Sequence, residues 1–232
     1  MTFVKGKTRL DQNTTIKETM MTSSNLENQI GSTENEGPEV IDFDSLLSLV
    51  KSRHSIRQFT PEPIPDEYIE KIIEVARWAP SCKNSQPWEF VVIQNQETRT
   101  AIVRLMDEDY EKQGRQAPSG PSQAQLFIIV CGDVGNKPPA SLGRRSDSMY
   151  YSSLGNSILY LALAATTLGL GAQWVSAIAQ PNVESGVKNM LNFPDTWQIF
   201  DMLALGFPDG GAKPRSVREI ADIVYYERYE NS

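Results

Sequence analysis

The chain of 232 residues is poor in the residue types on which much metal and hydrolytic chemistry depends. It has one histidine, His54, and two cysteines, Cys82 and Cys131, which are far apart and form no Cys-x-x-Cys pair. This pattern argues against a disulfide framework and against a zinc or iron–sulfur site, so we expect no bound metal and a reducing compartment. No Ser-His-Asp triad can be built away from His54, and no paired carboxylates stand out, so the sequence gives little support to hydrolytic chemistry.

Long apolar runs are also missing. The longest, at 157–172, is shorter than the roughly 18 residues that a membrane span requires, and it ends in glycines. The first residues lack the continuous apolar segment and the cleavage site of a secretory signal. We therefore predict a buried helix at 157–172, no membrane association and a cytoplasmic location.

Positive charge is scarce, and the formal net charge is −7. Nucleic acid is therefore not an expected partner. Against this background the sequence "RHSIR" at 53–57 places Arg53 and Arg57 four residues apart. Such a pair is often only a solvated surface, but in an acidic chain it also indicates a specific anion.

Residues 1–40 differ in composition from the rest of the chain. They are dominated by Thr, Ser, Asn, Gln and Glu, and such a segment cannot bury enough apolar surface to offset the entropy of ordering. We predict that 1–40 is a disordered tail, or an arm that orders on a partner. One domain would then extend over 41–232.

Helices and strands alternate in the predicted domain. Apolar residues at helical spacing predict helices over 41–52, 64–80, 97–112, 150–168 and 182–191. Short β-branched and aromatic runs predict strands over 88–94, 125–133, 172–178 and 199–207. The segment 150–168 is apolar almost all round, as a central helix would be.

The glycines near residue 170 do not form a dinucleotide-binding fingerprint. G-x-G-x-x-G would need a glycine where Trp174 stands, and these glycines follow a helix and not a strand. We interpret Gly169 and Gly171 as the end of a helix, where a positive φ is needed.

A chain with few titratable catalysts and a candidate anion site fits an enzyme whose bound cofactor carries the reaction. Four motifs, in order along the chain, resemble the FMN-dependent nitroreductase family. They are "RHSIR" at 53–57, "APSCKNSQPWEFVVI" at 79–93, "GLGAQWVSAI" at 169–178 and "ALGFPDGGAKPRS" at 204–216. The second motif is the most specific, and the resemblance covers about residues 43–224.

The resemblance implies that the first and last motifs hold the FMN phosphate. Arg53 and Arg57 would surround it together with Lys213 or Arg215, because guanidinium groups suit bidentate phosphate binding.

The other residues of the first motif have two readings each. Ser55 would add a hydroxyl to the phosphate or to the flavin edge, or would cap the local backbone. His54 would contact the flavin or pack in the core.

The resemblance also implies a flavin that lies across a dimer interface. The residues that would reach it from the partner subunit are Pro80, Ser81, Cys82 and Asn84. We interpret Cys82 as a structural thiol and Trp88 as a core residue.

One face of the isoalloxazine would be covered by the third motif, through Trp174, Val175, Ser176 and Ala177. Backbone N–H groups there could reach flavin N5 and O4 and favour the anionic reduced flavin. Asn156 is either a flavin-side amide or a hydrogen-bonded core residue.

The implied fold is α+β, with a mixed, largely antiparallel sheet flanked by helices in an interlocked homodimer. The implied function is a flavoprotein oxidoreductase that passes hydride from NADH or NADPH through flavin N5 to a nitroaromatic, quinone or similar small-molecule acceptor by a ping-pong mechanism. No side chain would act as a catalyst. The alternatives are a reductive dehalogenase-like or flavin-fragmenting enzyme on the same fold, and a non-catalytic flavin-binding or sensing protein. Residues 106–125 depart from the family pattern and leave the acceptor open.

Overall fold

The computed structural model describes residues 41–212 and 214–229, so the predicted tail lies outside the described residues. The unit from Phe43 to Ser232 contains the described helices and strands. Its helices are α1 (Phe43–Ser52), α2 (Asp66–Ala76), α3 (Gln96–Lys112), α4 (Arg144–Thr167) and α5 (Pro181–Leu191). Its strands are β1 (Trp88–Ile93), β2 (Leu126–Asp133), β3 (Gly171–Val175) and β4 (Trp197–Gly206). The predicted order of helices and strands is confirmed.

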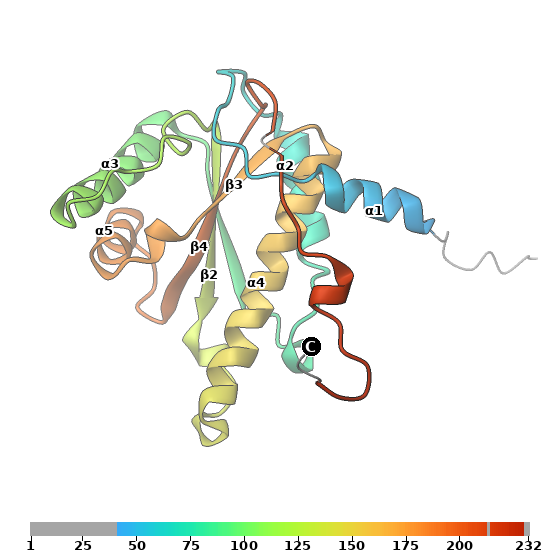
Figure 1. Cartoon of the computed structure of the whole chain (residues 1–232). Coiled ribbons are helices and arrows are strands. Elements are labelled where there is room, and N and C mark those ends of the chain that lie inside the picture. Colours follow the sequence, from blue (N-terminus) through green and yellow to red (C-terminus); the bar gives the residue numbers. More distant parts are fainter. Residues whose placement is uncertain (1–40, 213, 230–232) are drawn as a thin grey trace, which may run out of the picture. The chain divides into compact units, whose positions relative to one another are not determined.

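The four strands form one antiparallel sheet in the order β1-β2-β4-β3. The stretch 53–60 extends this sheet at its β3 edge: Ser55 forms a parallel bridge with Ala172, and Phe59 forms an antiparallel bridge with Pro208. The predicted mixed, largely antiparallel sheet is therefore confirmed. Because of this pairing, the arginine motif lies beside the end of β4 (Figure 1).

Each face of the sheet has its own apolar core. Successive side chains of a strand point to opposite faces, and β2 is apolar on both: Ile128 and Val130 belong to the core formed with α2 and α4, whereas Phe127 and Ile129 belong to the core formed with α3 and α5. Figure 1 shows these two pairs of helices on opposite sides of the sheet. A continuous apolar run such as that of β2 is what a strand covered on both faces requires.

The central helix α4 is longer than predicted. It begins at Arg144 and not at residue 150. The segment 144–149 is helical although it is polar and shows no apolar periodicity. Gly169 has φ of 74°, as predicted for a helix end. The same prediction is wrong for Gly171, which lies in β3: a Cβ there would be 2.8 Å from Cβ of Ile56, so close approach of the chain is the reason for this glycine.

Within 41–212 and 214–229, no helix is both long enough and apolar enough to cross a membrane.

Cys82 and Cys131 are not joined to each other and are free thiols. Burial raises the pKa of the Cys131 thiol to about 12, which keeps this group in its protonated form. Trp88 is buried in the core, as predicted.

Candidate flavin site

The first and last motifs meet in a cleft at the end of β4. Two backbone hydrogen bonds join them: the N–H of Thr60 donates to the carbonyl of Phe207 over 2.9 Å, and the N–H of Asp209 donates to the carbonyl of Gln58, also over 2.9 Å. The cleft has a volume of about 210 Å³. Its lining residues are Ser55, Ile56, Arg57, Gln58, Ser119, Asp209, Gly210, Gly211 and Ala212.

Among the described residues that line the cleft, Arg57 is the cation, and it has no carboxylate partner. Arg57 is exposed, and within the described part of the chain its guanidinium donates a long hydrogen bond of 3.5 Å to the carbonyl of Ser55. No ion pair to Arg57 is found among the described residues. Gly210 has φ of 99° and, like Gly211, leaves the backbone uncovered by a side chain. The carboxylate of Asp209 lines the same cleft and would repel a bound anion. The attraction of that anion to Arg57 and to backbone N–H groups must therefore be stronger than this repulsion.

Arg53 and Arg215 are not among the residues that line this cleft. Arg53 is half-buried at the end of α1, and Arg215 is exposed in the segment after residue 213. Lys213 lies outside the described residues. His54 lines a neighbouring cavity of about 300 Å³ that shares Ile56, Gly210 and Ala212 with this cleft. The structure therefore brings Ser55 and Arg57 together in the cleft and places His54 beside it.

The flavin-facing segment predicted from the third motif lies at the end of β3. The strand ends at Val175, and Ser176–Ala179 forms a 3₁₀ turn, which corrects the prediction of a strand to residue 178. The first N–H groups of such a turn have no partner within it. Ala177 is half-buried and Ser176 is exposed, so this end of the turn is accessible to a ligand.

A buried carboxylate holds this segment in place. Asp201 of β4 accepts a hydrogen bond of 2.6 Å from Nε1 of Trp174, and Ser176 donates a second bond to it. Burial raises the pKa of Asp201 above its ordinary value, and the two hydrogen bonds partly oppose this rise. Asp201 thus connects the exposed indole and the turn to the centre of the sheet.

The second motif forms a tight loop that is tied to α4. Nδ2 of Asn156 donates to the carbonyl of Pro80 over 2.9 Å, and the N–H of Cys82 donates to Oγ of Ser153 over 3.1 Å. Asn84 is exposed and has φ of 54°, a conformation that asparagine tolerates better than most residues. Asn156 is therefore a hydrogen-bonded residue that holds the loop.

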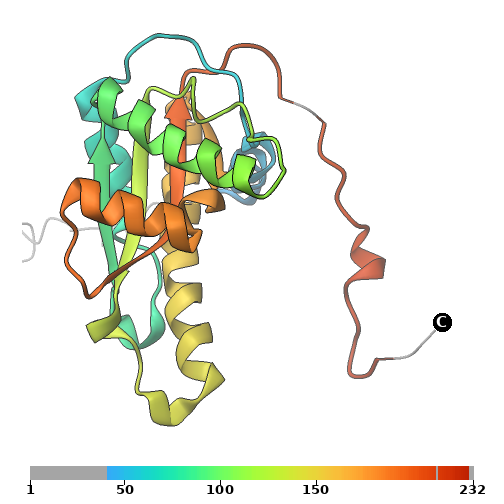
Figure 2. The ribbon, with the colours of Figure 1, turned by 90° about the vertical axis from the view of Figure 1, so that its left-hand side faces the viewer.

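Within one chain this loop is separated from the cleft. Figures 1 and 2 show the stretch 53–60 at one end of the sheet and the loop after α2 near the other end. A single copy of the chain does not bring Pro80, Ser81, Cys82 and Asn84 to Arg57.

Sequence reasoning missed two residues next to the cleft, Gly120 and Gln173. A Cβ on Gly120 would lie 1.6 Å from Oε1 of Gln173 and 3.2 Å from Cα of Arg57. Gln173 is buried, and its Oε1 has no donor among the described residues. The only sequence signal is the turn-rich composition around Gly120, in the region that departs from the family pattern. In the described part of the chain, no group of three His, Cys, Asp or Glu side chains could hold a metal ion.

Comparison with known proteins supports a flavoenzyme class. The model of the nitroreductase family matches residues 50–207, more than half of the chain, and the chain belongs to this family.

Two curated relatives show how varied this family is. The chain is 28% identical over 211 residues to 4-nitrobenzoate reductase of Pseudomonas putida, which covers 76% of this chain and 90% of that protein. It is 25% identical over 200 residues to iodotyrosine deiodinase of Danio rerio. This alignment covers 78% of this chain and 66% of that protein. Among solved structures, NADPH:FMN oxidoreductase from Vibrio harveyi complexed with NAD+ has a TM-score of 0.66 at 20% identity, covering 80% of this chain and 78% of that one. This last likeness shows the fold.

Proposed function

We propose that this chain is an FMN-dependent oxidoreductase that uses NADH or NADPH to reduce a nitroaromatic, a quinone or a similar small acceptor. The observation that carries the proposal is the cleft in which Arg57 and Ser55 meet the glycines 210–211. Membership of the nitroreductase family supports it, as do the names of the Pseudomonas putida and Vibrio harveyi proteins.

The residues of the cleft fit a phosphate monoester. Arg57 offers a guanidinium that no described carboxylate neutralises, and a guanidinium binds phosphate oxygens through two parallel N–H groups. The backbone at Gly210 and Gly211 is open to a close approach. When bound, FMN would supply two-electron chemistry between the nicotinamide and the acceptor.

The protein's part is to position the cofactor and set its electrostatics. In the proposal, Arg57, Ser55 and the backbone of 210–212 hold the phosphate, and the N–H groups at the start of the 3₁₀ turn face the ring system. Such fixed donors stabilise negative charge that develops on a bound group. Asp201 holds that turn in position by accepting hydrogen bonds from Trp174 and Ser176.

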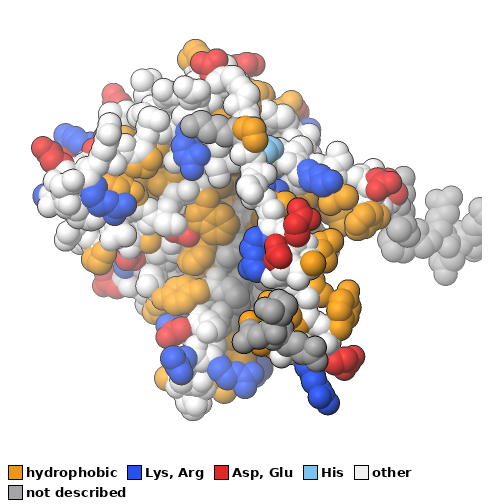
Figure 3. All heavy atoms as spheres, in the orientation of Figure 1, with side chains coloured by type: hydrophobic (Ala, Val, Ile, Leu, Met, Phe, Trp, Pro, Cys, Tyr) orange, Lys and Arg blue, Asp and Glu red, His pale blue; other side chains and the backbone are white. Residues whose placement is uncertain are grey.

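The proposal includes a homodimer, in which the loop 80–84 of one copy completes the site of the other. Apolar side chains are exposed on α1, where Phe43 is 73% exposed, and on the segment after residue 213, where Ile220 is 74% exposed. Figure 3 shows hydrophobic side chains gathered over α1 on this face. Clusters of this kind on one chain are typical of surfaces that another protein covers.

A reductive dehalogenase is the second candidate, because the chain also resembles iodotyrosine deiodinase along 78% of its length. Turnover of halogenated phenols with release of halide, but no turnover of nitroaromatics or quinones, would favour this candidate. If NAD(P)H is not oxidised with any acceptor although flavin is bound, the chain is a flavin-binding protein without turnover.

The cofactor assignment is tested by Arg57→Ala. Loss of a charge-assisted bond to the phosphate should weaken FMN binding by about 10- to 100-fold. Riboflavin lacks the phosphate, so its affinity should fall far less. Flavin fluorescence titration measures both ligands.

The matched control is Lys71→Ala, an exposed cation on α2 that pairs with Glu67 at 3.8 Å. Its FMN affinity should stay near that of the wild type. Equal losses for FMN and riboflavin in Arg57→Ala would show that Arg57 supports the fold or the ring and not the phosphate.

A further inference from the structure

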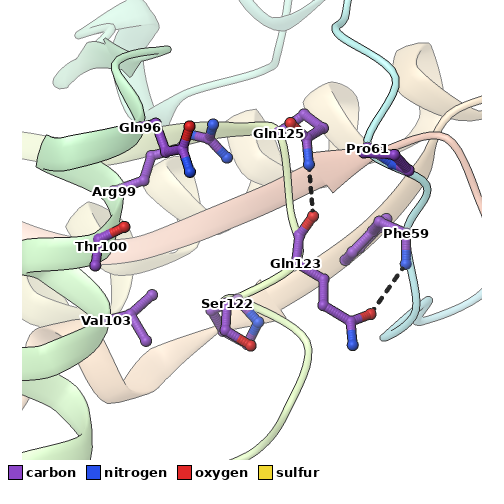
Figure 4. A pocket seen from close by; sticks show the side chains of 10 residues that line it. Phe59, Pro61, Gln96, Arg99, Thr100, Val103, Ser122, Gln123 and Gln125 are labelled. Carbon is purple, nitrogen blue, oxygen red and sulfur yellow. Dashed lines mark hydrogen bonds between the residues drawn. The ribbon is translucent and has the colours of Figure 1, made fainter.

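We propose that the cavity between α3 and the loop before β2 is a second ligand site, which binds a small organic carboxylate. The cavity has a volume of about 440 Å³. Its walls come from α3, from residues 121–125 and from the stretch 59–61 (Figure 4). None of the described residues lines both this cavity and the cleft that contains Arg57.

The charge in the cavity comes from Arg99 of α3. Its Nη1 donates to the carbonyl of Ala124, but its Nε is buried and has no acceptor. No carboxylate within 41–212 or 214–229 forms an ion pair with Arg99, and no Asp or Glu lines the cavity. A partly buried cation without a counter-ion is unfavourable, and a bound anion would remove that penalty.

Arg104 of the same helix is the contrasting case. It is exposed, does not line this cavity, and has Glu108 as a partner at 3.5 Å. A surface arginine of α3 thus has a carboxylate partner, whereas the arginine at the cavity has none.

The rest of the lining defines the body of the ligand. Gln96, Thr100 and Val103 follow the helical spacing i, i+4, i+7 and share the cavity face of α3. Figure 4 shows Phe59 and Pro61 on the opposite side. One cation at an edge lined by amides and hydroxyls suits the charge of a single carboxylate, which a guanidinium can bind through two parallel N–H groups. The apolar wall suits a compact hydrocarbon body.

The walls are held together by hydrogen bonds of their own. The N–H of Phe59 donates to Oε1 of Gln123 over 3.3 Å. The N–H of Gln125 donates to the carbonyl of Leu205 over 2.8 Å, which fixes this loop to β4. The cavity is therefore built before a ligand enters, as most small-molecule sites are.

Calorimetric titration of the full-length protein with cyclohexanecarboxylate tests the site, with neutral cyclohexanecarboxamide as the matched probe. We expect saturable binding of the carboxylate and at least about tenfold weaker binding of the amide. Arg99→Gln should lower carboxylate affinity by about tenfold or more, while Arg104→Gln should stay within about twofold of the wild type. Thr100→Phe should block the cavity without removing the bond from Arg99 to Ala124.

Four results would overturn the proposal: no saturable binding to the wild type, equal affinity for both probes, equal losses in Arg99→Gln and Arg104→Gln, or undiminished binding to Thr100→Phe. If Arg99→Gln does not fold, as circular dichroism would show, Thr100→Phe decides alone. Flavin content is not part of the readout, so the outcome is independent of the proposed cofactor.

Discussion

At the scale of single residues, Asp201 is the least favourably placed charge next to the candidate flavin site. The residue is 8% exposed, and burial raises the pKa of its carboxyl group although Trp174 and Ser176 both donate hydrogen bonds to it. A carboxylate whose pKa is raised by folding binds its proton more tightly in the folded than in the unfolded state. Its ionisation therefore destabilises the fold at neutral pH.

We expect this penalty to be visible as a pH dependence in Asp201→Asn. The unfolded carboxyl titrates near 3.8 and the folded one at higher pH, so the free energy of unfolding of the wild type, relative to the variant, should fall as pH rises above about 4. The fall amounts to about 1.4 kcal/mol for each unit by which the two pKa values differ. Urea unfolding at several pH values measures it.

Asp195→Asn, at an exposed position, is the control for the loss of a carboxylate that is not buried. A constant difference for Asp201→Asn would contradict the raised pKa. The asparagine can still accept the bond from Trp174, so a loss of fold is not expected.

At the scale of elements, the loop between α3 and β2 joins two sites. Ser119 lines the cleft of Arg57, whereas Ser122 and Gln123 line the cavity of Arg99. Gly120 lies between them and packs against Gln173 and Arg57. A change in the backbone path of this loop would therefore alter the lining of both sites.

Gly120→Ala should disturb the loop and weaken FMN binding. The added Cβ would be 1.6 Å from Oε1 of Gln173, which is buried and has little room to move, and 3.2 Å from Cα of Arg57. Overpacking of this kind destabilises by about 1–3 kcal/mol, which thermal unfolding and flavin titration would show. Gly155→Ala in α4, where the nearest atom is 3.9 Å away, should be neutral or stabilising.

A double variant identifies the cause. Gly120→Ala with Gln173→Ala should recover part of the stability that the first change removes, because the closest atoms are gone. If the double variant is no more stable than Gly120→Ala, the loss of stability comes from the contact with Cα of Arg57 and not from Gln173.

Elements that follow local periodicity could be predicted from the sequence, and contacts between distant segments could not. The apolar run of β2 and the spacing of α2 predict their structures directly. The first turns of α4 could not be predicted, because they depend on the ion pair of Lys137 with Asp147 and on the hydroxyl of Ser146, which donates to the carbonyl of Pro138.

The same distinction applies to the candidate site. The motif containing Arg57 was visible in the sequence. The residues that complete its cleft, Ser119 and Asp209, come near it only because 53–60 joins the sheet beside the end of β4. The cavity of Arg99 has no sequence motif at all, since its walls come from three separate segments.

At the scale of the whole molecule, the proposed flavin site is divided between two copies of the chain. The cleft of Arg57 and the loop of Asn84 lie at different ends of the sheet in one chain (Figures 1 and 2). In a twofold dimer, residue i of one subunit meets residue j of its partner while residue j meets residue i, so two equivalent sites result. A flavin-loaded monomer in sedimentation would contradict this arrangement.

Mixed dimers test the division directly. Arg57→Ala removes the proposed phosphate ligand, and Asn84→Gly removes the side chain of the loop while allowing its φ of 54°. If each site uses Arg57 of one copy and Asn84 of the other, a dimer of the two variants has one intact site and one doubly altered site. Co-expression with two affinity tags isolates such dimers, and flavin titration should then show about half of the sites with wild-type affinity. If both residues serve the same site within one chain, every site of the mixed dimer carries one change and no site recovers.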